Sequence, residues 1–232
     1  FGAGNYNQNA AYGLSLDSTG NCFITGRYFT KAIFDTITIS SPLPNEVFIA
    51  KYTTDGNVVW ARSGGGDFGI HTGFAIANDA GGNSYLTGDF FGHLTIDNFT
   101  LDAIDAEQKM FLAKFSPSGK TLWAEKIGSG GYYGIASGLC LDKSGNATIA
   151  GFFRSTIDFG STQLSFNRNI IAYALLAVNY DSEGNFIWGV KSDGTDQNTS
   201  GYSICGDAQG NTYITGGFSK KTIFGSTTLN QD

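Results

Sequence analysis

Short runs of alternating hydrophobic and polar residues follow one another along the whole chain, separated by Gly, Asn, Asp and Ser. Runs such as "CFITG", "TYITG" and "VFIAKY" are rich in Val, Ile, Thr, Tyr and Phe, the residues that β-strands favour. No stretch sustains the period of about 3.6 residues that marks an amphipathic helix. The pattern therefore predicts an all-β protein of short strands joined by tight turns.

The runs recur as a long repeat. Four segments align on an Asp-x-x-Gly-Asn turn: "GLSLDSTGNCFITG", "AIANDAGGNSYLTG", "GLCLDKSGNATIAG" and "SICGDAQGNTYITG". Their aspartates, Asp17, Asp79, Asp142 and Asp207, are 62, 63 and 65 residues apart. Trp60, Trp123 and Trp188 keep the same step, 63 and then 65 residues. The two markers divide one region, residues 1–232, into repeats of approximately 11–72, 73–135, 136–200 and a partial 201–232.

Each repeat has the same internal order. A first strand with a small residue in its middle leads through the aspartate turn to a second strand, which ends at a glycine. The small residues are Ser15, Ala77, Cys140 and Cys205, and the glycines are Gly26, Gly88, Gly151 and Gly216. An aromatic residue follows each glycine by two places, at Tyr28, Phe90, Phe153 and Phe218. A Thr-rich segment comes next, then a third strand, a hairpin turn ("DG", "SG" or "EG") and the tryptophan strand.

A repeated four-stranded antiparallel sheet buries both faces only when sheets pack on one another around an axis, as in a β-propeller. The small residues suit the innermost strand of each blade. The tryptophan is expected on the outermost strand, wedged between neighbouring blades. The glycine-rich runs "SGGGDFG" and "GSGGYYG" would then be linkers that turn the chain sharply from rim to axis. A β-solenoid needs a shorter period, and tandem β-sandwiches need modules of about 100 residues.

The motifs resemble the bacterial SBBP-type β-propeller repeat. The first repeat carries the resemblance in "GNCFITG" and "FIAKYTTDGNVVWARSGG", and the second in "GNSYLTG" and "FLAKFSPSGKTLWAEKIGSGG". The third departs, because Asn179 stands where Lys51 and Lys114 stand, so we interpret that lysine as surface decoration. The resemblance implies a repeat scaffold in large secreted or surface proteins, as in Bacteroidetes, and it carries over no catalytic residue.

The sequence contains three complete repeats and about half of a fourth. Because a closed ring typically has four to eight blades, two interpretations stand. The chain is a piece of a larger propeller, or a four-bladed ring closes with an incomplete last blade. An unclosed ring would expose apolar faces and strand edges.

Charge and composition limit the classes of molecule that we expect the protein to bind. The net charge is −6 and no basic run occurs, so neither nucleic acid nor anionic membrane is an expected partner. No apolar stretch is long enough to span a bilayer; "IIAYALLAV" is the longest candidate. No export signal is visible in "FGAGNYNQNA". Cys22, Cys140 and Cys205 are too few for a disulfide framework and are interpreted as small buried hydrophobes.

Candidate chemistry is sparse. His71 and His93, 22 residues apart, have no metal-binding spacing. The four turn aspartates are weak calcium candidates, although an aspartate in this pattern more often caps its own turn. Asp102, Asp105 and Glu107 form the densest acidic cluster, expected to be a solvated loop. The repeated aromatic residues could stack on sugars, but their strand register favours the core. No cofactor is indicated.

These observations predict a non-enzymatic, extracellular or cell-surface β-propeller scaffold for adhesion or protein–protein contact. Its partners would be a protein or glycan at a surface, or further blades of the same polypeptide. The alternatives are a carbohydrate-binding lectin and a propeller hydrolase. The hydrolase would need carboxylates converging at the axis, where we expect Ser, Ala and Cys instead.

Overall fold

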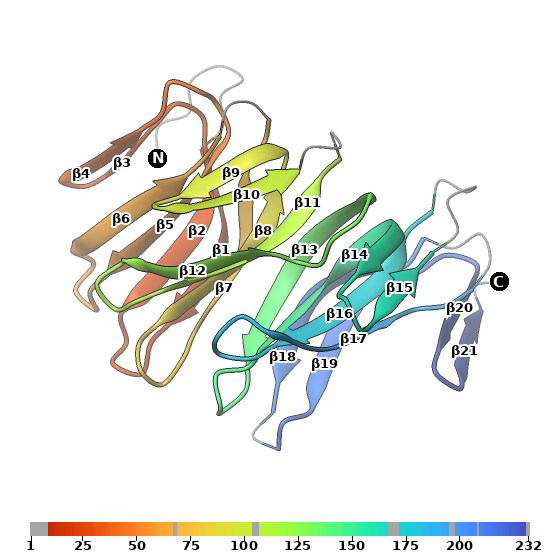
Figure 1. Cartoon of the computed structure of the whole chain (residues 1–232). Helices are drawn as coiled ribbons and strands as arrows, with labels where there is room; N and C mark the ends of the chain where they lie inside the picture. The colour runs from red at the N-terminus through yellow and green to blue at the C-terminus, as the bar shows by residue number, and fades with distance from the viewer. Residues whose placement is uncertain are drawn as a thin grey trace.

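A computed structural model describes residues 9–66, 69–103, 107–166, 172–194, 198–207 and 209–230. Three four-stranded antiparallel sheets and a final pair of strands follow one another as a fan (Figure 1). The fold is therefore all-β, with repeated sheets consistent with the blades of a β-propeller, as the repeat predicts. We refer to these units as blades 1 to 4.

Blade 1 contains β1 (Ala10–Leu16), β2 (Cys22–Tyr28), β5 (Glu46–Tyr52) and β6 (Val58–Gly64), with the hairpin β3 (Lys31–Phe34) and β4 (Ile37–Ser40). Blade 2 contains β7 (Thr72–Asn78), β8 (Ser84–Phe90), β11 (Lys109–Phe115) and β12 (Thr121–Lys126), with β9 (Gly92–Ile96) and β10 (Phe99–Ala103). Blade 3 contains β13 (Tyr132–Leu141), β14 (Ala147–Asp158), β16 (Ala174–Tyr180) and β17 (Phe186–Lys191), with β15 (Gln163–Ser165) paired to the end of β14. Blade 4 contains β18 (Ser200–Gly206) and β19 (Thr212–Gly217), with β20 (Lys221–Phe224) and β21 (Thr227–Asn230).

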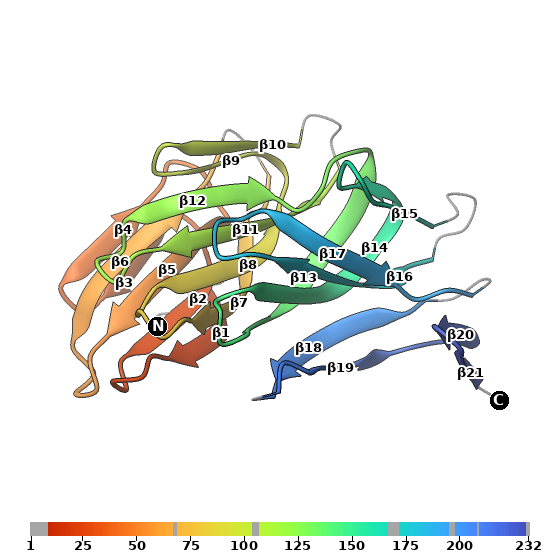
Figure 2. The same ribbon diagram turned by 60° about the horizontal axis from the view of Figure 1, so that its bottom comes forward.

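The first strands of successive blades lie side by side along the inner side of the fan. β1 contacts β7, β7 contacts β13 and β13 contacts β18, and Figure 2 shows the four in succession. Asn78 Nδ2 donates to Ser15 Oγ at 3.0 Å, so the small residue of β1 does face the next blade. The close approach at this side explains why each first strand carries a small residue at its centre.

Steric crowding explains why each second strand ends at a glycine. Each of the four first strands carries a β-bulge at the same place. Beside the bulge, a Cβ on Gly88 would lie 1.8 Å from the Thr72 carbonyl oxygen, and the other three glycines are equally crowded. Only glycine lets the two backbones meet there.

The hydrophobic core sits mainly in the seams between blades, where the tryptophans lie. Trp60 is 5% exposed, and its indole Nε1 donates to the Pro117 carbonyl in the hairpin turn of blade 2 at 3.1 Å. Trp123 Nε1 donates in the same way to the Ser182 carbonyl of blade 3 at 3.2 Å. Trp188 is 39% exposed, because the matching hairpin of a fourth blade is absent from the described residues.

A second tie, which we call the backbone clasp, recurs at every seam. Two reciprocal backbone hydrogen bonds join the linker after each blade to the hairpin region of the next blade. The clasped pairs are Gly65 with Thr95, Ser129 with Asp158 and Asp193 with Ile223. The N···O distances range from 2.7 to 3.0 Å. Each blade is therefore held to its neighbour at the rim as well as along its face.

Three glycines of the first linker act by close approach, whereas Gly69 of the same run has a positive φ of 115°, so the expected turning role holds for only part of the run. Gly64, Gly65 and Gly66 do not adopt a positive φ. A Cβ on Gly65 would instead lie 1.3 Å from Glu46 Oε2, and one on Gly66 would lie 1.7 Å from the His93 carbonyl oxygen. In the second linker, Gly128 and Gly130 do have positive φ, at 69° and 97°.

Two further expectations are wrong. Lys114 is buried, and its Nζ donates to the Ser182 carbonyl across the seam at 2.9 Å, so this lysine is not surface decoration. The cysteines are not fully buried: Cys22 and Cys140 are half-buried, and Cys205 is exposed. Cys205 lies on a strand of blade 4, where fewer strands cover it. None of the three forms a disulfide.

Candidate functional site

The hairpins that follow each second strand form a repeated surface feature, and we call them the rim hairpins. They are β3–β4, β9–β10, the end of β14 with β15, and β20–β21. In Figure 1 each lies towards the outer part of its blade, and the first three contact the outermost strand of their own sheet. One face of each is buried, as at Phe34 and Leu94. The other face points to solvent.

Hydroxyl groups line the exposed faces of the rim hairpins. Thr95 Oγ1 and Thr100 Oγ1 lie 3.1 Å apart across β9–β10, and Thr156 Oγ1 donates to Ser165 Oγ at 3.3 Å across β14–β15. Thr38 and Thr227 are exposed on the first and last hairpins. A cross-strand hydroxyl pair therefore occurs on the hairpins of blades 2 and 3, whereas Thr38 of blade 1 lies opposite Ile33, which is 64% exposed.

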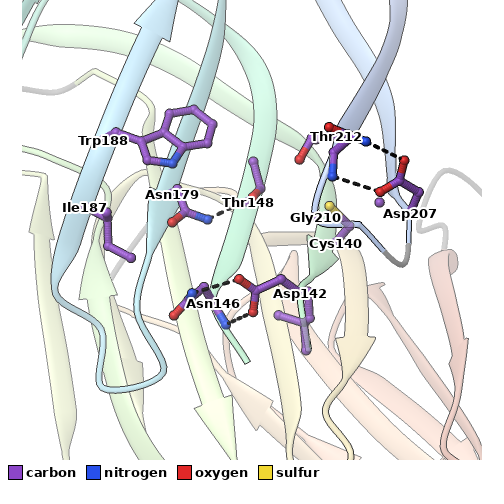
Figure 3. A pocket seen from close by; sticks show the side chains of 13 residues that line it. Cys140, Asp142, Asn146, Thr148, Asn179, Ile187, Trp188, Asp207, Gly210 and Thr212 are labelled. Atoms are coloured by element: carbon purple, nitrogen blue, oxygen red, sulfur yellow. Dashed lines mark hydrogen bonds between the residues drawn. The ribbon is translucent and has the colours of Figure 1, made fainter. Parts of the chain in front are cut away.

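A pocket of about 260 Å³ lies between blade 3 and the first turn of blade 4. Figure 3 shows Trp188, Asn179 and Thr148 on one side, and Asp207 and Thr212 on the other. Cys140 also lines it, and burial raises the pKa of that thiol to about 11. A thiol with this pKa stays protonated near neutral pH, so it is a poor nucleophile.

The pocket lies where two large side chains of blade 2 are replaced by smaller ones in blade 3, and where no hairpin of blade 4 covers Trp188 within the described residues. In blade 2 the corresponding cross-strand pair is Tyr85 with Lys114, whose Nζ lies 4.9 Å from the ring centroid. In blade 3 the pair is Thr148 with Asn179, and Asn179 Nδ2 donates to Thr148 Oγ1 at 2.9 Å. The smaller pair satisfies its own polar atoms but leaves the space unfilled.

The four turn aspartates cap their own turns. Asp17 Oδ1 accepts from the backbone N–H groups of Thr19 and Asn21 at 2.9 Å, and Oδ2 accepts from Asn21 Nδ2 at 2.8 Å. Asp79, Asp142 and Asp207 each accept the same pair of bonds from the Asn of their turn. These bonds hold the pKa of Asp17 well below its usual range, although burial opposes them. Among the described residues, no three His, Cys, Asp or Glu side chains gather closely enough to hold a metal ion.

The two histidines meet, but not as a metal site. His71 is buried, and its Nε2 lies 2.9 Å from the His93 carbonyl oxygen. A carbonyl only accepts, so Nε2 carries the proton and the bare Nδ1 faces Glu46 Oε2 at 3.7 Å. Burial raises the pKa of Glu46 to about 7 and lowers that of His71. The His93 ring turns away and pairs with Asp102 at 2.6 Å.

A second buried acid lies between blades 1 and 2. Asp89 is 1% exposed, and burial raises its pKa to about 7, while Gln108, Thr72 and the charge of Arg27 oppose the rise. Its carboxylate is therefore enclosed by neighbouring side chains and not presented at the surface. The sequence analysis did not single out Glu46 or Asp89. Each lies near the end of a largely apolar strand, and that position could have identified them as acids at risk of burial.

The structure also places the repeated aromatic residues and the acidic cluster that the sequence analysis named. Tyr28, Phe90 and Phe153 are core residues, whereas Phe218 is half exposed on blade 4. Glu107 pairs with Lys109 at 3.7 Å, and Asp105 lies outside the described residues, so the acidic cluster is not seen as a unit. No helix among the described residues is long and apolar enough to cross a bilayer.

Comparison with known proteins agrees with the fold. No protein-family model matches the chain. The chain is similar to an uncharacterized WD repeat-containing protein of Acanthamoeba polyphaga mimivirus, with 25% identity over 118 residues, or 49% of this chain. The matched part is 8% of that protein's length. WD repeats form β-propeller blades, so this weak similarity and the repeated four-stranded sheets point to the same architecture.

Proposed function

We propose that this protein is a non-enzymatic β-propeller scaffold that works outside the cell, in adhesion or protein–protein contact. The observation that carries the proposal is the row of rim hairpins, which carry exposed hydroxyl groups and of which the last three are clasped to the linker after the preceding blade. A contact surface on a rigid frame loses little conformational entropy when it binds. The resemblance to SBBP-type repeats supports the surface location.

The chemistry of the described residues favours a scaffold over the alternatives. Three of the four repeated aromatic residues lie in the core and offer no face to a sugar, which weighs against a lectin with one aromatic platform per blade. The acids Glu46 and Asp89 are only 2% and 1% exposed, so neither presents its carboxyl group to solvent. A glycosidase needs two carboxyl groups that flank a substrate.

Binding measurements test the proposal. The chain is applied to a panel of immobilised extracellular proteins and to a glycan array, next to a rim variant with Thr38, Thr100 and Thr227 changed to Arg. A control variant changes the exposed Ser18, Ala80 and Gln209, at the opposite ends of the blades, to Arg. We expect saturable binding to a protein that only the rim variant loses.

Two outcomes would overturn the proposal. Strong, saturable binding to one sugar class, with none to protein, would identify a lectin. Hydrolysis of a polysaccharide that disappears when a single acidic residue is changed would identify an enzyme.

A further inference from the structure

Four buried polar atoms of the first seam, between blades 1 and 2, have no hydrogen-bond partner. They are Arg27 Nε and Glu46 Oε2 on the blade 1 side, and His71 Nδ1 and Asp89 Oδ1 on the blade 2 side. Glu46, His71 and Asp89 are each at most 2% exposed. A buried ionisable group without a partner is costly in its charged form. The packing of this seam is therefore sensitive to which of these groups hold a proton.

The same place is filled differently in the later seams. The residue that begins the third strand is Glu46 in blade 1, Lys109 in blade 2 and Ala174 in blade 3. Lys109 Nζ donates to the Tyr132 carbonyl across the second seam, and alanine has no polar side-chain atom to satisfy. Among these three described positions, a carboxyl group with an unpartnered oxygen occurs only in the first seam.

The Glu46 carboxyl group lies directly against the backbone clasp of the first seam. A Cβ on Gly65 would be 1.3 Å from Glu46 Oε2, and Gly65 is the residue clasped to Thr95 of the rim hairpin β9–β10. His71 connects to the same hairpin, because its Nε2 donates to the His93 carbonyl at 2.9 Å. Glu46 Oε2 and His71 Nδ1 face each other at 3.7 Å, which is too long for a hydrogen bond. A charge on Glu46 would therefore act on the contacts that hold this hairpin to blade 1.

Burial decides the protonation of both acids against the influence of their neighbours. The groups that face them are His71, Tyr28 and Ser41 at Glu46, and Arg27, Thr72, Gln108 and Tyr133 at Asp89. Desolvation raises the pKa of Glu46 from 4.5 to about 7 and that of Asp89 from 3.8 to about 7. Their stabilising contributions are therefore complete below pH 3.8 and are lost as the pH rises through 7. Burial lowers the pKa of His71, so its contribution is lost as the pH falls below 6.5 and offsets that of one acid only.

From these contacts we propose that the first seam is a proton-controlled joint between blades 1 and 2. While Glu46 and Asp89 hold their protons, blade 1 stays closed against blade 2. When the two acids ionise, water enters the seam to solvate them, and the clasp between Gly65 and Thr95 opens more often. The joint thereby changes how firmly the rim hairpin β9–β10 is held to blade 1. The inference concerns the frame and does not depend on the function proposed for the rim hairpins.

Amide hydrogen exchange of the full chain, resolved by NMR at pH 6 and pH 8, tests the joint. The amides of Gly65 and Thr95 report on the first clasp. Those of Ser129 and Asp158 in the second clasp are the reference that cancels the general pH dependence of exchange. Two acids titrate in the closed seam near pH 7 and in the open seam near their ordinary values, and His71 opposes one of them. We therefore expect the first clasp to open about tenfold to thirtyfold more often at pH 8 than at pH 6, relative to the second.

Substitutions that keep the shape of the acids separate the joint from a general effect of pH. Glu46→Gln combined with Asp89→Asn should abolish the increase, and each single variant should lose part of it, so the test survives if the double variant fails to fold. Asp102→Asn is the control: its carboxyl group is 56% exposed on the same hairpin, and it should keep the full response. A clasp ratio that is the same at both pH values in the unmodified chain would overturn the proposal. So would a response that persists when both acids are replaced.

Discussion

Replacement of Trp60 by alanine should weaken the chain far more than replacement of Trp188. The two residues occupy equivalent places in blades 1 and 3, but one is 5% exposed and the other 39%. For a side chain of about 200 Å², the difference is about 70 Å², or about 2 kcal/mol at about 25 cal/mol per Å². The hydrogen bond to the Pro117 carbonyl adds about 1 kcal/mol. Trp60→Ala should therefore cost about 3 kcal/mol more than Trp188→Ala.

Urea unfolding followed by far-ultraviolet circular dichroism measures both costs in the same chain. Equal slopes with denaturant would show that the variants unfold the same amount of surface. Trp60→Phe provides an intermediate comparison, because it keeps one aromatic ring while removing the indole N–H and the five-membered ring, and it should cost about 1 to 2 kcal/mol. Costs for the two alanine variants that agree within about 0.5 kcal/mol would refute the idea that the indole ties adjacent blades.

Two more predictions concern buried positions. Because burial raises the pKa of Glu46 from 4.5 to about 7, its stabilising contribution is complete below pH 4.5 and is lost as the pH rises through 7. Glu46→Gln should therefore raise the free energy of unfolding at pH 8 by up to about 3 kcal/mol and change it little at pH 4.5; pH-dependent urea titrations measure this, and an equal effect at both pH values would contradict it. Gly88→Ala should destabilise the chain by about 3 kcal/mol or more, since its Cβ would lie 1.8 Å from the Thr72 carbonyl oxygen. Gly206→Ala, whose Cβ would have no neighbour closer than 3.7 Å, is the control and should cost less than about 1 kcal/mol by thermal unfolding; similar melting temperatures for the two would count against the steric argument.

The sequence predicts the repeat, the strand order and the hairpin turns well, because side-chain type and spacing encode each of them. The turn glycines Gly56, Gly119 and Gly184 all have positive φ, as the "DG", "SG" and "EG" pairs indicate. The backbone clasp escaped prediction because it uses only N–H and C=O groups, which every residue type supplies. Its linker residues, Gly65, Ser129 and Asp193, share no chemical feature.

The role of the seam lysine was misjudged for a different reason. Asn179 in place of lysine suggested a position without constraint, but the residue opposite it changes as well, from Tyr85 or Phe23 to Thr148. When the repeats are compared one position at a time, the lysine position looks unconstrained. When the two cross-strand partners are compared together, lysine occurs with an aromatic residue and asparagine with threonine. The buried Glu46 and Asp89 were overlooked because a charged residue beside an apolar strand is normally solvated.

Because of the backbone clasp, the rim can join neighbouring blades through its main chain and present variable side chains to solvent at the same time. Its hydrogen bonds do not involve the side chains at Thr95, Asp158 or Ile223, and these three already differ in size, charge and polarity. Outward-facing residues of the hairpins can therefore be exchanged with little effect on how the blades are joined. A lineage of such proteins could acquire new specificities through its rim while the frame beneath stays the same.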